Sequence, residues 1–363
     1  MTHAKHRIAL LPGDGIGQEV CESAVLVLDV LARRHGFELV WTEFPWGCDF
    51  YLQTGSMMAP GALETLESYD AILLGAVGSP KVKDHVSLWG LLIPIRRRFD
   101  QYVNLRPVHS VRGVRSALNS PEPIDFLIVR ENSEGEYSEA GGRLFAGTPR
   151  ELAVQESVFS RTGIDRIVNF AADAALERKG KLVSATKSNG IIHTMPFWDE
   201  VASEVAESRG VPNDLQHIDA LAARFVIAPQ SLDVVVASNL FGDILSDLGS
   251  ALTGGIGLGP SANLNPERDH PSMFESIHGS APDIAGLGVA NPTGELWASS
   301  MMLEHLGEVD AARELIEAVE TVLSVPGRCT RNLGGTGTTR SFTDAVVNHL
   351  EPLARNASPV VKV

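Results

Sequence analysis

Short apolar runs along the chain alternate with longer stretches in which apolar residues recur every three or four positions. The runs at 7–11, 71–77, 124–129 and 181–185 have the length and composition of buried strands. The stretch after the first run carries an apolar stripe through 20–31 with the period of a helix. Strands that alternate with helices in this way predict an α/β fold with a largely parallel sheet.

Two parts of the pattern interrupt this alternation. Residues 132–160 begin with a glycine-rich stretch and continue as extended segments, which we interpret as antiparallel strands forming a protruding dimerisation arm. The glycine-rich segment 253–261 indicates a domain boundary. A chain of 363 residues suits two domains, because single cores stop growing near about 250–300 residues.

A pair of carboxylates lies in the segment 233–249, which begins as an apolar β-branched strand and turns into a helix. Asp243 and Asp247 are four residues apart on that helix and therefore lie on one side of it. Like charges at this spacing repel unless a cation lies between them, and Mg²⁺ or Mn²⁺ prefers such oxygen ligands. Alternatively, Asp243 favours the helix N-terminus and Asp247 is solvated, and the spacing alone leaves both interpretations open.

Charge, hydropathy and cysteine usage narrow the possible partners and the compartment. The net charge of −15 argues against nucleic acid or an anionic membrane surface as a partner. The longest apolar runs are too short to cross a bilayer, and the first residues do not have the pattern of a secretory signal. Three cysteines without CxxC spacing favour free thiols in a reducing cytoplasm.

An acidic protein that binds an acidic small molecule needs arginines gathered at one place. Arg96, Arg106 and Arg130 fall in otherwise apolar surroundings, and guanidinium groups bind carboxylates bidentately. These residues therefore suit a di- or tricarboxylate substrate. A purely structural pairing of Arg130 is an equal alternative, and we interpret Arg97 and Arg98 as a solvated helix face.

Two glycine-containing turns are candidates for nucleotide binding. The first, 12–17, does not have GxGxxG spacing and predicts only a tight turn from strand to helix. The second, 278–292, offers backbone amides at Gly279 and Ser280 to a phosphate and the carboxylate of Asp283 to ribose hydroxyls.

Seven motifs carry a resemblance to a known family: LPGDGIG, NLRPV, VREN, TKSN, HIDALAARFV, SNLFGDILSDLG and HGSAPDIAG. From Ile8 to about Thr339 the chain resembles the β-decarboxylating dehydrogenases, which act on isopropylmalate, isocitrate, homoisocitrate, tartrate and D-malate. The stretches DHVSLWG, VRENSEGEYS and PSANLNPER are most similar to the tartrate/D-malate branch.

The resemblance implies an isopropylmalate-dehydrogenase-like α/β fold of two domains that share a continuous mixed sheet. A larger, discontinuous domain, 1–103 plus 257–363, would bind the nucleotide. A smaller domain, 104–256, would bind metal and substrate and carry the dimerisation arm.

The same resemblance implies roles for particular residues. Arg96, Arg106 and Arg130 would hold the substrate carboxylates, and Tyr137 would be the general acid. Lys187 from the other subunit would act on the substrate hydroxyl proton. The metal, Mn²⁺ or Mg²⁺, would be bound by Asp243, Asp247 and, from the other subunit, Asp219. NAD would be bound by His278, Gly279, Ser280, Ala281, Asp283, Ile284 and Asn291.

Substrate choice would lie in residues 88–92. Trp89, Gly90 and Leu92 are candidates because a bulky indole with no acid or hydroxyl beside it suits a small C4 acid. Alternatively, Trp89 is merely packed against its domain. Two stretches depart from the branch pattern, 78–81 and 293–296, and Glu295 in the second would alter cofactor affinity from near the nicotinamide end.

The resulting prediction is a cytoplasmic homodimer that oxidises D-malate or tartrate with NAD and then removes the β-carboxylate. A monovalent cation such as K⁺ is a further cofactor that the sequence leaves open. The alternatives are a 3-isopropylmalate dehydrogenase, a metal-dependent lyase without net NAD turnover, and a non-catalytic subunit that regulates a partner.

Overall fold

The computed structural model describes residues 4–118, 122–325 and 327–351, which form two compact units. The first unit contains the described residues up to Leu91, Val111–Val114 and those from Phe274 onward. The second contains Leu92–Ser110 and the described residues from Arg115 to Met273. The second unit therefore extends the expected 104–256 segment at both ends, and the functions expected of the two domains stay predictions.

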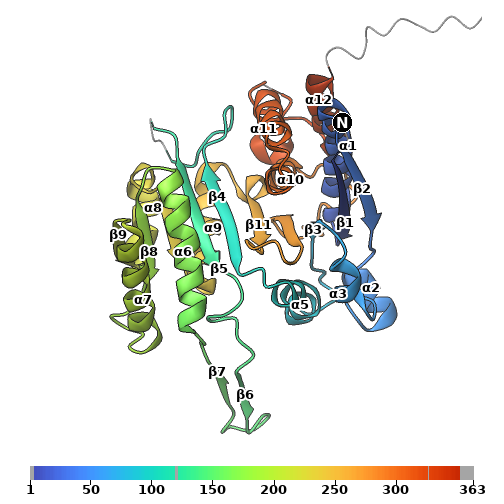
Figure 1. The fold of residues 1–363 in the computed structure, drawn as a ribbon. Helices are drawn as coiled ribbons and strands as arrows, with labels where there is room; N and C mark the ends of the chain where they lie inside the picture. The colour runs from blue at the N-terminus through green and yellow to red at the C-terminus, as the bar shows by residue number, and fades with distance from the viewer. Residues whose placement is uncertain (1–3, 119–121, 326, 352–363) are drawn as a thin grey trace, which may run out of the picture. The chain divides into compact units, whose positions relative to one another are not determined.

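The first unit is an α/β layer built on a parallel arrangement of β2, β1 and β3, with β12 next to β3. Helix α1 packs on β1 and β3 because one of its faces carries the apolar stripe, and α10, α11 and α12 pack against α1 (Figure 1). The bounds are β1 Lys5–Gly13, α1 Gly17–His35, β2 Glu38–Glu43, α2 Cys48–Thr54, α3 Ala62–Leu66, β3 Ala71–Ala76, α4 Asp84–Ser87, β12 Ser272–Ser276, α10 Thr293–His305, α11 Val309–Leu323 and α12 Thr339–Leu350. A π-helical stretch, Leu88–Leu92, follows α4.

The second unit has a mixed sheet in the order β11-β4-β5-β10-β8-β9. Strand β4 is antiparallel to both β11 and β5, whereas β5, β10, β8 and β9 are parallel to one another. Helices α6 and α7 cover one face of this sheet, and α8 and α9 cover the other (Figure 1). All four residues of β10 are buried, as expected of a central strand covered on both sides.

The bounds in the second unit are α5 Ile93–Arg98, β4 Val103–His109, β5 Asp125–Glu131, β6 Gly141–Leu144, β7 Leu152–Gln155, α6 Arg161–Glu177, β8 Leu182–Thr186, α7 Thr194–Arg209, β9 Asn213–His217, α8 Ile218–Ile227, β10 Val234–Ala237, α9 Asn239–Thr253 and β11 Pro260–Leu264. The predicted α/β class with a mixed sheet is confirmed. The search for membrane spans found none: no helix within the described ranges has both the length and the apolar character to cross a bilayer.

The expected antiparallel strands in 132–160 are present as β6 and β7, which pair with each other in a separate two-stranded sheet and extend away from the second unit's larger sheet (Figure 1). Every residue of both strands is exposed, including Leu144 and Val154. An isolated two-stranded ribbon is marginally stable by itself. Its exposed apolar side chains suit the dimerisation role, which stays a prediction.

Candidate active site

Asp243 and Asp247 lie one turn apart on α9, the helix that follows strand β10. Strand β10 ends at Ala237, and α9 begins at Asn239, so Asp243 falls in its second turn. The side chain of Asp243 is 35% exposed and that of Asp247 is 55% exposed. Asp243 therefore belongs to the buried part of the site, whereas Asp247 is open to solvent.

Three arginines converge on Asp243. Arg130 is the penultimate residue of β5 and its Nη1 donates to Asp243 Oδ1, while Arg106 Nη1 of β4 lies 3.2 Å from the same oxygen. Arg96, in the last turn of α5, is 7% exposed and contributes electrostatically at both Asp243 and Arg130. The structure thus brings together the three arginines that the sequence analysis selected.

Hydrogen bonds hold the arginines in place. Arg130 Nε and Nη2 both donate to Asn239 Oδ1, at 3.1 and 2.7 Å, so this guanidinium is clamped from one side. Arg106 Nη1 also donates to Ser246 Oγ at 2.6 Å. The sequence analysis missed Asn239 and Ser246, although both lie in the SNLFGDILSDLG motif and on the same helix as the aspartates.

A glycine next to Asp243 makes this arrangement possible. A Cβ at Gly242 would lie 2.6 Å from the Cβ of Arg130, closer than side chains approach. Gly242→Ala is therefore expected to destabilise the second unit by about 1–3 kcal/mol through overpacking. Urea unfolding measures this loss, and Gly142→Ala is the control because a Cβ there would meet nothing within 4 Å. An unchanged unfolding midpoint for Gly242→Ala would contradict the close approach of helix and strand.

Tyr137 completes the cluster. Its hydroxyl donates to Asp243 Oδ2 at 3.0 Å, and its ring lies below Arg130, whose guanidinium carbon is 5.6 Å from the ring centroid. Burial raises the pKa of Tyr137, and the charge of Asp243 adds to the increase. At neutral pH the tyrosine therefore keeps its proton. The expected lowering of its pKa by Lys187 from another subunit stays a prediction.

The ionisation of the carboxylates follows from their surroundings. Burial opposes the charged form of Asp243, but Arg130 and Arg106 outweigh it, so the pKa of Asp243 is lowered. Burial raises the pKa of Asp247; Arg106 opposes this and the nearby charge of Asp243 adds to it. A cation next to both carboxylates would relieve this repulsion. The pair therefore fits two ligands of a hard, oxygen-binding ion such as Mg²⁺ or Mn²⁺.

Lys187 and Asp219 lie apart from this cluster and contact each other. Lys187 follows β8, and Asp219 lies in the first turn of α8. The Nζ of Lys187 donates a hydrogen bond to Asp219 Oδ1 at 2.8 Å. The hydrogen bond from Lys187 lowers the pKa of Asp219. Within the described part of this chain, no three His, Cys, Asp or Glu side chains gather around a possible metal position. A third ligand from Asp219 therefore requires a second copy of the chain.

The nucleotide-binding candidates occupy the first unit, in the loop between β12 and α10. This loop lies against the turn after β1, where Ile16 N donates to Ser280 O at 2.9 Å. A Cβ at Gly15 would lie 2.1 Å from Ser280 O, so the turn requires glycine there. Asp14 connects this turn to its surroundings by accepting from Gly78 N and Cys48 N, each at 2.8 Å. The tight turn predicted for 12–17 is confirmed.

Polar atoms in this loop are buried without protein partners. His278 Nε2 and Asn291 Nδ2 have no hydrogen-bond partner among the described residues. Burial lowers the pKa of His278, which keeps its ring neutral and able to donate or accept. Unsatisfied buried polar atoms are costly unless a ligand pairs with them, so these atoms fit a polar ligand such as a nucleotide.

The remaining candidates of the loop have distinct surroundings. Ile284 and Ala281 pack against Ile16 and Val20, so their side chains hold the loop on α1. Asp283 and Gly279 are exposed, and space beside Gly279 is open because a Cβ there would meet nothing within 4 Å.

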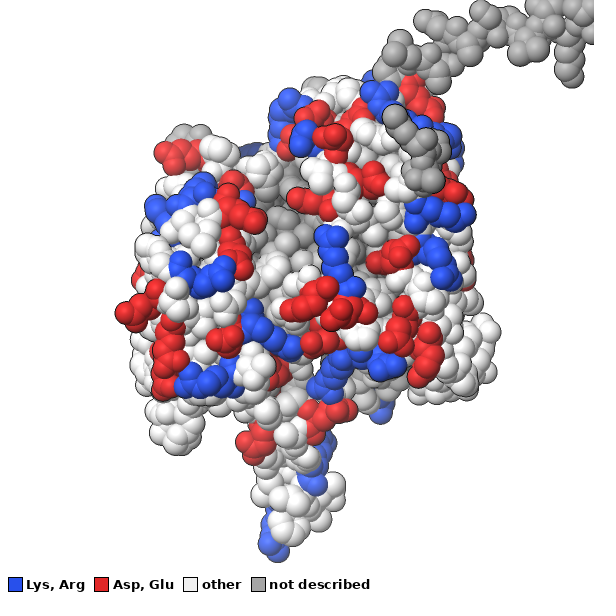
Figure 2. Space-filling model, viewed as in Figure 1, with Lys and Arg blue, Asp and Glu red and all other residues white. Residues whose placement is uncertain are grey.

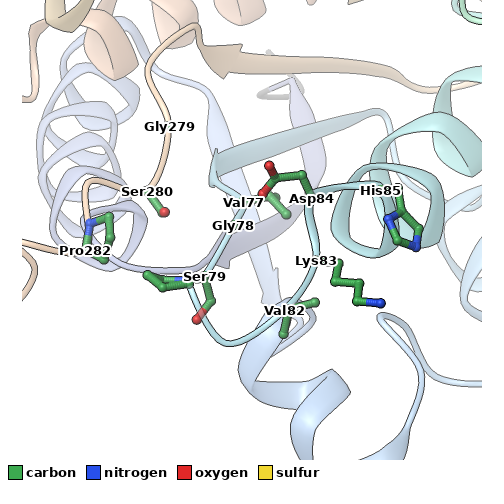
Figure 3. Close-up of a pocket in the computed structure, with 11 residues that line it drawn as sticks. Val77, Gly78, Ser79, Val82, Lys83, Asp84, His85, Gly279, Ser280 and Pro282 are labelled. Atoms are coloured by element: carbon green, nitrogen blue, oxygen red, sulfur yellow. The ribbon is translucent and has the colours of Figure 1, made fainter.

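A pocket of about 630 Å³ lies beside this loop, a volume typical of small-molecule sites (Figure 3). Gly279, Ser280 and Pro282 line one side of it, and residues 77–80 and 82–85 line the other. The divergent stretch 78–81 contributes Gly78, Ser79 and Pro80 to this lining. Sequence analysis did not assign residues 82–85 to a site. The available signal was that the loops after β3 and β12 follow neighbouring strands, where α/β folds bind ligands.

The proposed selectivity stretch has π-helical hydrogen bonding, which is often found at functional positions. Gly90 packs close to Met57, since a Cβ at 90 would lie 2.6 Å from Met57 Cγ. Trp89 and Leu92 are half-buried. That these residues contact a substrate stays a prediction. The alternative that Trp89 is merely packed against its domain also stays open.

Comparison with known proteins agrees with the fold. The profile of the isocitrate/isopropylmalate dehydrogenase family matches residues 7–346, and the chain belongs to this family. A solved structure of isocitrate dehydrogenase from Methylococcus capsulatus superposes with a TM-score of 0.86 at 32% identity, covering 95% of this chain and 99% of that one.

Relatives within the family are more similar in sequence. The D-malate dehydrogenase (decarboxylating) of Escherichia coli K12 is 52% identical, covering 94% of this chain and 97% of the relative. The tartrate dehydrogenase/decarboxylase of Pseudomonas putida is 51% identical, covering 96% and 98%. The probable tartrate dehydrogenase/decarboxylase of Bacillus subtilis strain 168 is 49% identical, covering 97% and 100%. The resemblance to this branch is confirmed, and these relatives support a decarboxylating hydroxy-acid dehydrogenase.

Proposed function

We propose that the protein oxidises a C4 2-hydroxy dicarboxylic acid, D-malate or a tartrate, with NAD and Mn²⁺ or Mg²⁺, and then removes the β-carboxylate as CO₂. The observation that carries the proposal is the gathering of three buried arginines at Asp243. Arg96, Arg106 and Arg130 are each at most 7% exposed, and Asp243 is the partly exposed carboxylate that Arg106 and Arg130 contact. Guanidinium groups bind carboxylates bidentately, so arginines gathered in this way suit a dicarboxylate.

The arginines would bind and orient the substrate. Burial and the neighbouring charge of Arg106 lower the pKa of Arg130, which indicates that the cluster disfavours its own positive charges. A carboxylate that binds bidentately between the guanidiniums removes this repulsion. Because Asn239 clamps Arg130, the guanidinium is held in place before the substrate arrives.

Tyr137 would supply the proton that ends the reaction. NAD would supply the hydride acceptor for oxidation at C2, and Lys187 of a second copy would act on the proton of the substrate hydroxyl, so that the product of this step would be a 2-keto acid. Cleavage of the bond to the β-carboxylate releases CO₂ and leaves an enolate, and the Tyr137 hydroxyl delivers a proton to its carbon. The raised pKa of Tyr137 keeps that proton available at neutral pH.

Asp243 and Asp247, with Asp219 of a second copy, would hold the divalent metal. When bound, such an ion would supply Lewis-acid stabilisation of the negative charge that develops on the substrate oxygen. Asp243 would then have two roles, as a ligand of the ion and as the partner that orients Tyr137 through the 3.0 Å hydrogen bond.

The loop 278–292 would bind NAD in the first unit. The unpartnered His278 Nε2 and Asn291 Nδ2 support a polar ligand at this loop. The exposed carboxylate of Asp283 favours a ribose 2′-hydroxyl, and would repel the 2′-phosphate of NADP. We further propose that the protein works in the cytoplasm.

NADH formation with Mn²⁺ tests the proposal directly, across D-malate, the tartrates, 3-isopropylmalate and isocitrate. We expect D-malate or a tartrate to have the highest kcat/KM, NAD to be preferred over NADP, and EDTA to abolish the activity. A tenfold lead for 3-isopropylmalate would refute the proposed C4 preference of the stretch 88–92. Turnover that is unaffected by EDTA would refute the metal.

The proposed homodimer shares each site between two copies, which predicts complementation. Lys187→Ala and Tyr137→Phe are each expected to be nearly inactive as pure homodimers. Mixed by unfolding and refolding together, they are expected to recover about a quarter of wild-type activity, because half of the dimers are mixed and each has one intact site. Recovery is absent if each chain uses its own Lys187. Within the described part of one chain, Asp219 does not join Asp243 and Asp247 in a group that could hold a metal, which supports sharing.

A further inference from the structure

The second divergent stretch, 293–296, contains an acid in an unusual place. Glu295 is the third residue of α10 and its exposed fraction is 0%, as are those of its neighbours Leu296 and Ala298. A fully buried acid without a cationic partner is rare, because burial of a charge is costly. The side chain of Glu295 is enclosed in the core of the first unit. Its expected effect on cofactor affinity from near the nicotinamide end stays a prediction.

The carboxyl group of Glu295 contacts residues of β12 and α1 in that core. Its Oε2 accepts a hydrogen bond from Ser276 N at 3.2 Å, and its Oε1 lies 3.7 Å from the Cys21 Sγ of α1. Ser276 Oγ donates in turn to Gly75 O of β3 at 3.3 Å. A Cβ at Gly75 would lie 2.9 Å from Cys21 Sγ, so the packing around the acid leaves no spare room.

Among the described residues, no cationic side chain forms an ion pair with Glu295. Burial raises the pKa of Glu295 well above its usual value; the hydrogen bonds from Ser276 and Cys21 oppose this, and the charge of Glu275 on β12 adds to it. Cys21 of α1 has a raised pKa for the same reasons, burial and then Glu295. Burial therefore favours the neutral, protonated form of the Glu295 carboxyl group.

The position of Glu295 connects both ends of the nucleotide loop. Ser276 is the last residue of β12, two residues before His278, while Glu295 stands four residues after Asn291. At the second end, Asn291 Oδ1 accepts from Thr293 N at 3.0 Å. The Glu295–Ser276 bond thus ties the end of the loop to its beginning.

We propose that Glu295 is a positioning residue for dinucleotide binding: its side chain fixes the spacing of the two loop ends, and thereby the relative positions of His278 and Asn291. It does so without contacting the ligand, because it has no exposed surface. The inference rests on the proposed function for the nature of the ligand, but the tie between the loop ends can be tested without any ligand.

Three variants show whether the acceptor group of Glu295 holds the loop ends in place. Glu295→Gln retains a neutral acceptor for Ser276 N at nearly the same volume, whereas Glu295→Ala removes it. Glu304→Ala changes an exposed glutamate of the same helix and is the matched control. Hydrogen exchange of the apo protein is expected to show faster exchange at Ser276–Ser280 in Glu295→Ala, and wild-type rates in Glu295→Gln and Glu304→Ala.

Binding of NAD and NADH, measured by titration, gives the second readout. We expect Glu295→Ala to raise both dissociation constants at least about tenfold, equivalent to about 1.4 kcal/mol, with the KM for the dicarboxylate nearly unchanged. Glu295→Gln is expected to stay within about twofold, because the neutral amide replaces the neutral acid. Wild-type exchange in Glu295→Ala, or equal losses in Glu295→Gln and Glu295→Ala, would overturn the inference. Failure of the wild-type protein to bind either nucleotide would instead refute the proposed function. The hydrogen-exchange result would still show whether Glu295 holds the two ends of the loop together.

Discussion

Asp243→Asn is expected to lower kcat/KM for the dicarboxylate by about 10²–10³-fold, the effect of removing one group that stabilises developing charge in an active site. Asp243 is in contact with Arg130, Arg106 and Tyr137 at once. The amide has almost the same shape but no charge, so the guanidiniums lose their buried counter-charge and the proposed metal loses a ligand. Steady-state kinetics across a range of Mn²⁺ concentrations measures both losses.

A second variant and a test of folding show whether the loss is specific to the role of Asp243. Asp247→Asn is expected to weaken Mn²⁺ activation with a smaller loss at saturating metal, because Asp247 is half-exposed and lies 3.8 Å from Arg106. Circular dichroism and size-exclusion chromatography check that Asp243→Asn is folded. A folded Asp243→Asn variant with wild-type kcat/KM and wild-type metal dependence would refute the role of the aspartate.

Tyr137→Phe is expected to lower the turnover number by about 10²–10⁴-fold, the range for loss of a general acid. The substitution removes the hydroxyl that donates to Asp243 but retains the ring below Arg130, so the packing of the cluster is preserved. The oxidation step uses other groups, and we expect the loss to fall on the steps after hydride transfer.

Decarboxylation of added oxaloacetate with Mn²⁺, without nucleotide turnover, measures those steps separately. Tyr137→Phe is expected to be deficient in this assay as well as in the overall reaction. Tyr51→Phe, in α2 of the other unit, is the matched control and is expected to behave as wild type. Unchanged oxaloacetate decarboxylation by Tyr137→Phe would exclude the tyrosine as the proton donor.

The sequence was most informative where a local pattern is sufficient. The alternation of apolar runs and helical stripes predicted the α/β class, since it depends only on which face of each element must be buried. The four-residue spacing of Asp243 and Asp247 correctly put both on one side of α9, and the PGDGIG stretch correctly predicted a tight turn.

Recognition of the family also came from the chain alone, because its motifs are continuous stretches of the sequence. Gly242, in one of these motifs, has a structural reason. Strand β5 and helix α9 lie so close together there that a Cβ at position 242 would collide with the side chain of Arg130. That approach concerns residues more than one hundred positions apart, so no local pattern explains it.

Only the tertiary structure decided what each polar side chain contacts. Arg130 was equally compatible with ligand binding and structural pairing, and it pairs with Asn239 while directing Nη1 to Asp243. Glu295 is enclosed between α1 and β12, and its contacts there with Cys21 and Ser276 could not be read from the sequence. Periodicity determines which residues are buried, whereas the partners of a buried polar group depend on the register and packing of elements that are distant in the sequence.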